Sequence, residues 1–221
     1  MAAAVSRSWR EIPHFAVTRE LRLDAVTAAV GEVRLVAPQV TLTDVLLRAL
    51  ALSFVHREDR TDLDIGLAVA TDRGVAIPVI HEVPRLDLLE LAATRRAAVG
   101  RARAGRGHTD DGRVPVSTLS NLGAIGVDQF TGIVPFGQTS LLTVGRAASR
   151  PVVDDGVLAV GVTMLATLNV DHRVRDGQHA GELLDRLARI LATPALLVGF
   201  GPLSATARNT EYTENTENKE S

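Results

Sequence analysis

The chain contains no cysteine, which excludes disulfides, a cysteine nucleophile and thiolate metal sites. Aromatic residues make up only 3% of it and the formal net charge is −2, so neither stacking platforms nor a basic field for nucleic acid is apparent. No apolar run reaches the length of a membrane span, and the N-terminus has no secretory apolar region. These absences predict a cytoplasmic protein with no nucleic-acid and no membrane partner.

What the 221 residues do contain is enough apolar sequence for one substantial core. Hydrophobic periodicity predicts strands at 15–23, 65–70, 75–80, 116–119, 140–144 and 160–170, and helices at 24–35, 44–56, 87–104 and from 177 onward. Thr43 is expected to cap the second of these helices. Helices mixed with strands at several connection lengths predict a two-layer α/β sandwich, a mixed β-sheet with helices on one face.

The segment 171–177, DHRVRDG, carries the clearest chemical signal, because it joins an uncharged strand to an amphipathic helix. His172 stands at the end of that buried strand, between Asp171 and Asp176, where a histidine is well placed to act as a general base. Asp176 also stands where a helix N-cap would. The alternative is that His172 is a hydrogen-bonded structural histidine and Asp176 only a cap. No pair of the six histidines has metal-ligand spacing, so no metal is predicted.

Four segments, in order along the chain, resemble one known family. They are residues 12–18 (IPHFAVT), 68–80 (AVATDRGVAIPVI), 118–123 (TLSNLG) and 171–177 (DHRVRDG). Together they resemble the dihydrolipoyl acyltransferase catalytic domain, the core component of 2-oxoacid dehydrogenase complexes. That domain is similar in fold to chloramphenicol acetyltransferase, so the resemblance implies the same fold here.

The resemblance also implies roles for three residues. His172 would be the base that deprotonates the acceptor, the Ser120 hydroxyl would donate to the oxyanion of the tetrahedral intermediate, and Asp176 would hold the local geometry. Acetyl-CoA would be the acyl donor, and Ser120 and His172 would meet across an interface of a homotrimer or a multiple of trimers. The residues alone, without the resemblance, favour the alternative that Ser120 is a strand hydroxyl bonded to its neighbours.

The chain is expected to divide into an N-terminal arm at 1–11, the catalytic domain at 12–204 and a tail at 205–221. The tail is rich in Thr, Glu and Asn and cannot bury apolar surface, so it is predicted to be disordered.

Two departures from the family pattern shape the functional prediction. Ile12 follows only eleven residues, with no lipoyl domain or linker before it, so no covalently bound lipoate is expected. The family's Asn-Pro-Pro is also missing from residues 132–145, GIVPFGQTSLLTVG. The leading prediction is a stand-alone O-acetyltransferase that acetylates a small-molecule hydroxyl acceptor, as in tetronate polyketide pathways. The alternatives are a dihydrolipoyl acyltransferase core of a dehydrogenase complex and an inactive scaffold paralogue.

Overall fold

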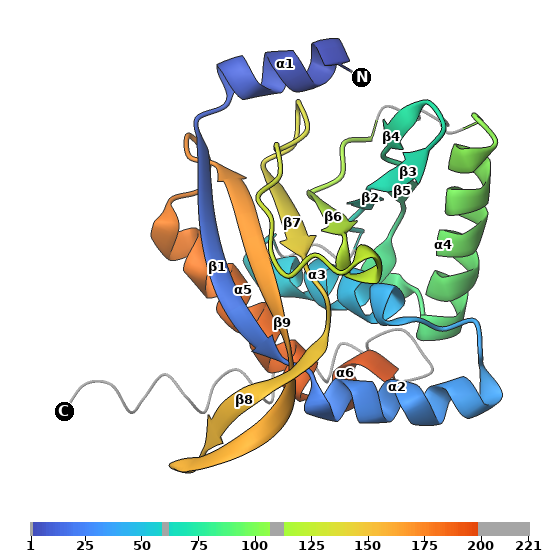
Figure 1. Cartoon of the computed structure of the whole chain (residues 1–221). Coiled ribbons are helices and arrows are strands. Elements are labelled where there is room, and N and C mark those ends of the chain that lie inside the picture. The colour runs from blue at the N-terminus through green and yellow to red at the C-terminus, as the bar shows by residue number, and fades with distance from the viewer. Residues whose placement is uncertain (1, 59–61, 107–112, 199–221) are drawn as a thin grey trace.

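The computed structural model describes residues 2–58, 62–106 and 113–198, which form a mixed sheet with helices packed against it (Figure 1). The helices are α1 (Ala2–Glu11), α2 (Asp24–Val36), α3 (Leu42–Glu58), α4 (Leu88–Arg103), α5 (Gly177–Ala192) and α6 (Ala195–Val198), with short 3-10 turns η1 (Val83–Arg85) and η2 (Gly123–Ile125). The strands are β1 (His14–Arg22), β2 (Ile65–Leu67), β3 (Val69–Thr71), β4 (Gly74–Ala76), β5 (Val79–Ile80), β6 (Ser117–Asn121), β7 (Ser140–Val144), β8 (Ala148–Asp154) and β9 (Val157–Asp171).

The main sheet has the strand order β1-β9-β7-β6-β2-β5, and β8 pairs with the first half of β9. β6 runs parallel to both β2 and β7, whereas β9 runs antiparallel to β1, β7 and β8. The β8–β9 hairpin extends beyond the body of the molecule, as Figure 1 shows. The predicted two-layer α/β sandwich on a mixed sheet is confirmed.

Alternation along β9 decides which face of the sheet carries the core. The even-numbered residues Met164, Ala166, Leu168 and Val170 are buried and belong to one apolar cluster with residues of α2, α3, α4 and α5. Among the odd-numbered neighbours, Thr163, Thr167 and Asn169 are polar, and Leu165 is the apolar exception; their side chains lie on the opposite face, which we call the helix-free face. Helices therefore cover one side, and a row of polar side chains lies on the other.

Of two sequence predictions about local structure, one needs correction and the other is confirmed. α3 begins at Leu42, so Thr43 lies inside its first turn instead of capping it. The cap is formed two residues earlier, where the backbone N–H and the hydroxyl of Thr41 both donate to Asp44 Oδ2 at 2.8 Å. The strands predicted at 65–70 and 75–80 do pair as an antiparallel hairpin: β2 with β5 and β3 with β4 share one register, and between them the Leu67 backbone N–H donates to Pro78 O at 3.0 Å.

The segment predicted as an N-terminal arm contains helix α1, which is fixed to the body through a loop of the helix-free face. The Ser8 hydroxyl donates to Val134 O, and Ile12 packs with Val134 and Leu141 in a small separate core. His14 completes the attachment: its Nδ1 donates to Ile12 O at 2.8 Å and its Nε2 accepts from the Val134 backbone N–H at 3.0 Å. The imidazole of His14 is therefore engaged on both sides.

Candidate active site

The candidate base lies where β9 ends and the chain turns into α5. The Asp171 carbonyl accepts from the backbone N–H groups of Val174 and Arg175, at 3.0 and 2.9 Å, which closes the turn. Asp176 then caps α5, because its Oδ1 accepts from the His179 backbone N–H at 2.8 Å. The predicted N-cap is confirmed, and the turn holds His172 at the end of the sheet.

His172 is exposed, and two contacts from the start of β1 define its position. Its backbone N–H donates to Pro13 O at 3.0 Å. Its imidazole meets the ring of Phe15 edge-on, with 5.1 Å between ring centroids and 78° between ring planes. Within the described residues the imidazole forms no hydrogen bond. Its nitrogens are therefore open to an incoming substrate.

The two carboxylates expected to hold His172 form their hydrogen bonds with other residues. Asp171 is buried and accepts from Arg173 Nη2 at 2.5 Å, from Arg173 Nε at 2.9 Å and from the Arg173 backbone N–H at 3.0 Å. These contacts with Arg173 hold the pKa of Asp171 below its usual range. The His179 backbone N–H likewise lowers the pKa of Asp176. Both groups are thus anions near His172, and neither hydrogen-bonds its ring.

The ion pair of Asp171 predicts a pH dependence of stability. Because its pKa is lower in the folded protein, its stabilisation is fully present above the unfolded pKa of about 4 and is lost as the pH falls through the folded value. In urea unfolding between about pH 5 and pH 3, the free energy of unfolding should fall more steeply for the wild type than for Asp171→Asn. Parallel pH curves for the two proteins would show that this carboxylate is not linked to folding.

Ser120 lies on β6, and its side chain belongs to the helix-free face. Its neighbour Leu119 is buried in the core, so alternation places Ser120 on the opposite side, with Thr118. The Thr118 hydroxyl is occupied by Gln138 Oε1, at 2.6 Å. The half-buried Ser120 hydroxyl, in contrast, has no hydrogen-bond partner in the part of the chain that the structure describes. It remains available as a donor.

The sheet register separates Ser120 from His172 within one chain. Ser120 pairs with Thr143 of β7, which pairs in turn with Thr167 of β9. His172 is five residues further along, about 17 Å in the strand direction, and β6 lies two strands away from β9, about 10 Å across the sheet. The structure brings His172 and Asp176 together but leaves Ser120 toward the other end of the sheet.

A cavity of about 500 Å³ lies at the same end of the sheet as His172. Its walls come from the chain just before β2, β6 and β7 and from the turn after His172, and they include Asp64, Arg113, Gln138, Val174 and Arg175. Arg113 pairs with the buried Asp64 at 2.9 Å, and the Arg175 guanidinium lies 5.0 Å from the centroid of the Phe54 ring. No sequence pattern indicated this cavity, because only the sheet brings its segments together.

The described residues hold no cluster of three or more His, Asp or Glu side chains that could bind a metal ion. None of the helices within them has both the length and the apolar character needed to cross a bilayer.

The arrangement defines a class of protein: an α/β sandwich with an exposed histidine at the end of a long strand next to the edge of the sheet. A solved structure of chloramphenicol acetyltransferase has this fold, with a TM-score of 0.50, 14% identity, and coverage of 86% of this chain and 94% of that one. The chain belongs to the 2-oxoacid dehydrogenases acyltransferase (catalytic domain) family, whose model matches residues 1–199.

The relatives that it resembles belong to pyruvate dehydrogenase complexes. It is 30% identical over 211 residues to the chloroplastic dihydrolipoyllysine-residue acetyltransferase component 4 of Arabidopsis thaliana, covering 88% of this chain and 44% of that protein. It is 30% identical over 138 residues to the corresponding component of Staphylococcus aureus, covering 62% of this chain and 32% of that protein. The chain thus spans less than half the length of these relatives.

Two solved structures share the fold closely. The cubic core of a pyruvate dehydrogenase multienzyme complex matches with a TM-score of 0.83 and 28% identity, over 88% of this chain and 87% of that one. Dihydrolipoamide acetyltransferase of Azotobacter vinelandii matches with the same TM-score, identity and coverage, and it was studied for the roles of one serine, one histidine and one asparagine in its catalytic mechanism.

Proposed function

We propose that the chain is a CoA-dependent acyltransferase in which His172 is the general base and Ser120 of a neighbouring copy is the oxyanion donor. The observation that carries this proposal is the spacing along the chain between Ser120, His172 and Asp176. The serine and histidine studied in the Azotobacter enzyme are separated by the same number of residues as Ser120 and His172, and the asparagine follows the histidine at the distance at which Asp176 follows His172. The exposure of His172 and the free Ser120 hydroxyl agree with these roles.

The reaction needs one proton to move out and back. His172 takes the proton of the acceptor thiol or hydroxyl as the acceptor attacks the thioester carbonyl carbon of acyl-CoA. The Ser120 hydroxyl donates to the oxyanion that forms. When the intermediate collapses, the carbon–sulfur bond breaks and His172 returns the proton to the CoA sulfur. The cavity beside Arg175 offers room next to the base for part of one substrate.

Asp176 serves this proposal as a structural residue. The Azotobacter enzyme has an asparagine at the equivalent spacing, and an asparagine side-chain oxygen can accept the same helix-capping hydrogen bond as a carboxylate. Asp176 makes this cap with the His179 backbone N–H, and either residue type can make it. The role of Asp176 is therefore to position the turn and not to transfer a proton.

The relatives favour a dihydrolipoyl thiol as the acceptor, because they are dihydrolipoyllysine-residue acetyltransferases. They therefore support the dehydrogenase-core interpretation more than the tetronate one, which was the leading prediction from the sequence. A hydroxyl acceptor remains the second candidate, since residues 132–145 lack the family's Asn-Pro-Pro. We further propose that copies of the chain form trimers, because a single chain keeps Ser120 far from His172.

Acceptor choice tests this proposal directly. With acetyl-CoA as donor, purified protein should release CoA faster with dihydrolipoamide than with a hydroxymethyl-bearing tetronate, by roughly tenfold or more, because a thiol is the stronger acid and yields its proton to an imidazole more easily. The rate is followed as CoA release, and mass spectrometry locates the acetyl group. His172→Ala is the control for uncatalysed exchange between thiols. Transfer to the hydroxyl acceptor alone would favour the tetronate interpretation.

A further inference from the structure

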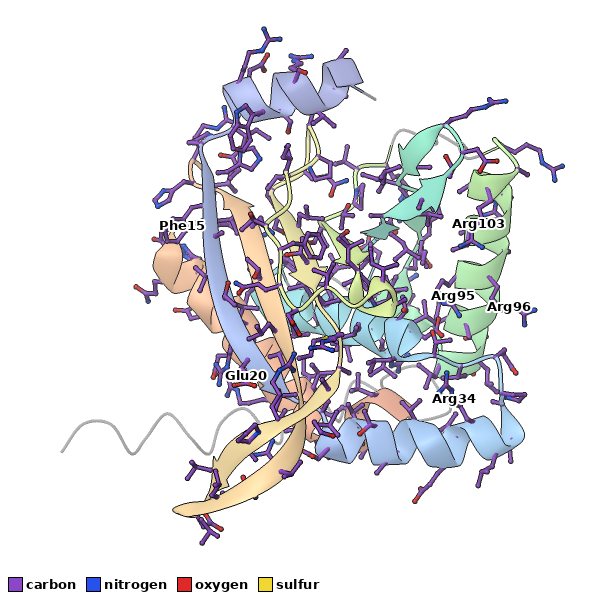
Figure 2. The ribbon with its side chains drawn as sticks, viewed as in Figure 1. Phe15, Glu20, Arg34, Arg95, Arg96 and Arg103 are labelled. Carbon is purple, nitrogen blue, oxygen red and sulfur yellow. The ribbon has the colours of Figure 1, made fainter. Side chains whose placement is uncertain are left out.

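We propose that Phe15 is a positioning residue for His172, so that an aromatic ring and not a carboxylate fixes the direction of the imidazole. This inference rests on the proposed function, in which His172 is the base. Figure 2 shows Phe15 on β1, beside the end of the sheet where α5 begins. The antiparallel pairing of β1 with β9 places the two residues together, because His14 is the partner of Asp171.

The contacts that orient His172 come from the start of β1. Its backbone is held by Pro13 O, and its ring has an edge-to-face contact with Phe15. Both nearby carboxylates are engaged, Asp171 by Arg173 and Asp176 by the first turn of α5. A histidine base normally takes its orientation from a hydrogen bond to its second nitrogen. Here packing against Phe15 fills that role.

The Phe15 ring is itself confined on another side by Gly177. A Cβ atom added at Gly177 would lie 3.3 Å from Cε1 and 3.5 Å from Cζ of Phe15. Gly177 is the first residue of α5, and its backbone does not require positive φ. Alanine therefore fits the helix, and its methyl group displaces the ring by a few tenths of an ångström. Gly177 provides a way to move Phe15 without removing it.

Misplacement of a catalytic group by a fraction of an ångström lowers turnover and leaves substrate affinity largely intact. Phe15→Leu should therefore lower kcat by roughly 10-fold with KM nearly unchanged, and Phe15→Tyr, which keeps the ring, should restore most of the rate. Gly177→Ala should lower kcat by roughly threefold although alanine favours the helix, so that thermal stability is kept or raised. If Phe15 had a purely structural role, its replacement would lower thermal stability and would not lower kcat selectively with KM unchanged.

The decisive measurement is a double-mutant cycle. If Gly177 acts through the ring, Gly177→Ala should cause no further loss of kcat in the Phe15→Leu background. Trp9→Leu is the matched control, because the Trp9 ring lies 5.6 Å from the ring of His14, a histidine outside the proposed chemistry. That variant should keep its kcat.

Three outcomes would overturn the inference: normal kcat in Phe15→Leu, simple additivity of the two substitutions, or a loss confined to KM. Should Phe15→Leu prove unstable, the Gly177→Ala variant still gives a result, since a normal kcat there would contradict the proposal. Failure of the proposed function is distinguishable, because it would appear as full activity in His172→Ala. The inference alone fails if His172→Ala is inactive and the ring substitutions have no effect.

Discussion

Replacing His172 with alanine should lower the turnover of acyl transfer by roughly 100- to 10,000-fold, which is the usual contribution of a positioned general base. The protein should stay folded, because the imidazole is exposed and forms no hydrogen bond within the described residues. Turnover is measured as CoA release at saturating acetyl-CoA, and thermal unfolding checks the fold.

His179→Ala is the matched control for that experiment. His179 lies in the same turn-and-helix segment, and its backbone N–H, which caps with Asp176, survives the substitution. This variant should keep turnover within a fewfold of the wild type. Near-normal turnover in a folded His172→Ala protein would remove His172 from the mechanism and with it the proposed function.

Replacing Ser120 with alanine should cost on the order of 100-fold in turnover, with little change in KM for acetyl-CoA, because an oxyanion donor acts mainly in the transition state. Ser117→Ala is a suitable comparison from the same strand, since the Ser117 hydroxyl accepts from Ser140 at 2.9 Å on the helix face and should affect stability more than turnover. A loss that appears only as weaker binding would make Ser120 a substrate contact.

Mixing the two variants tests whether the site is shared between copies. In randomly mixed trimers of His172→Ala and Ser120→Ala chains, about one quarter of the interfaces unite an intact histidine with an intact serine, so activity should return to about that fraction. Light scattering should give a trimer or a multiple of one. No recovery in confirmed mixed oligomers, or a stable active monomer, would show that the separation of Ser120 from His172 is bridged in another way.

Local patterns in the sequence determined most of the secondary structure. Alternation and helical spacing predicted β7 at its observed bounds, α2 and α4 to within a residue of theirs, and the Asp176 cap. These features depend on neighbours a few residues apart, so the information lies within each segment. Thr43 was assigned wrongly because Thr41 competes for the same cap and, together with Asp44, makes it.

The sequence also determined the family, through four ordered motifs, and with it the candidates Ser120, His172 and Asp176. What surrounds these candidates was decided only by the tertiary structure. The pairing of β1 with β9 sets Phe15 against His172, although the two residues are far apart in the chain. The register through β7 keeps Ser120 away from the histidine. Arg173 takes the carboxylate of Asp171 that the sequence had suggested for His172. Such partners follow from strand register and from competition among nearby donors, which local periodicity does not encode.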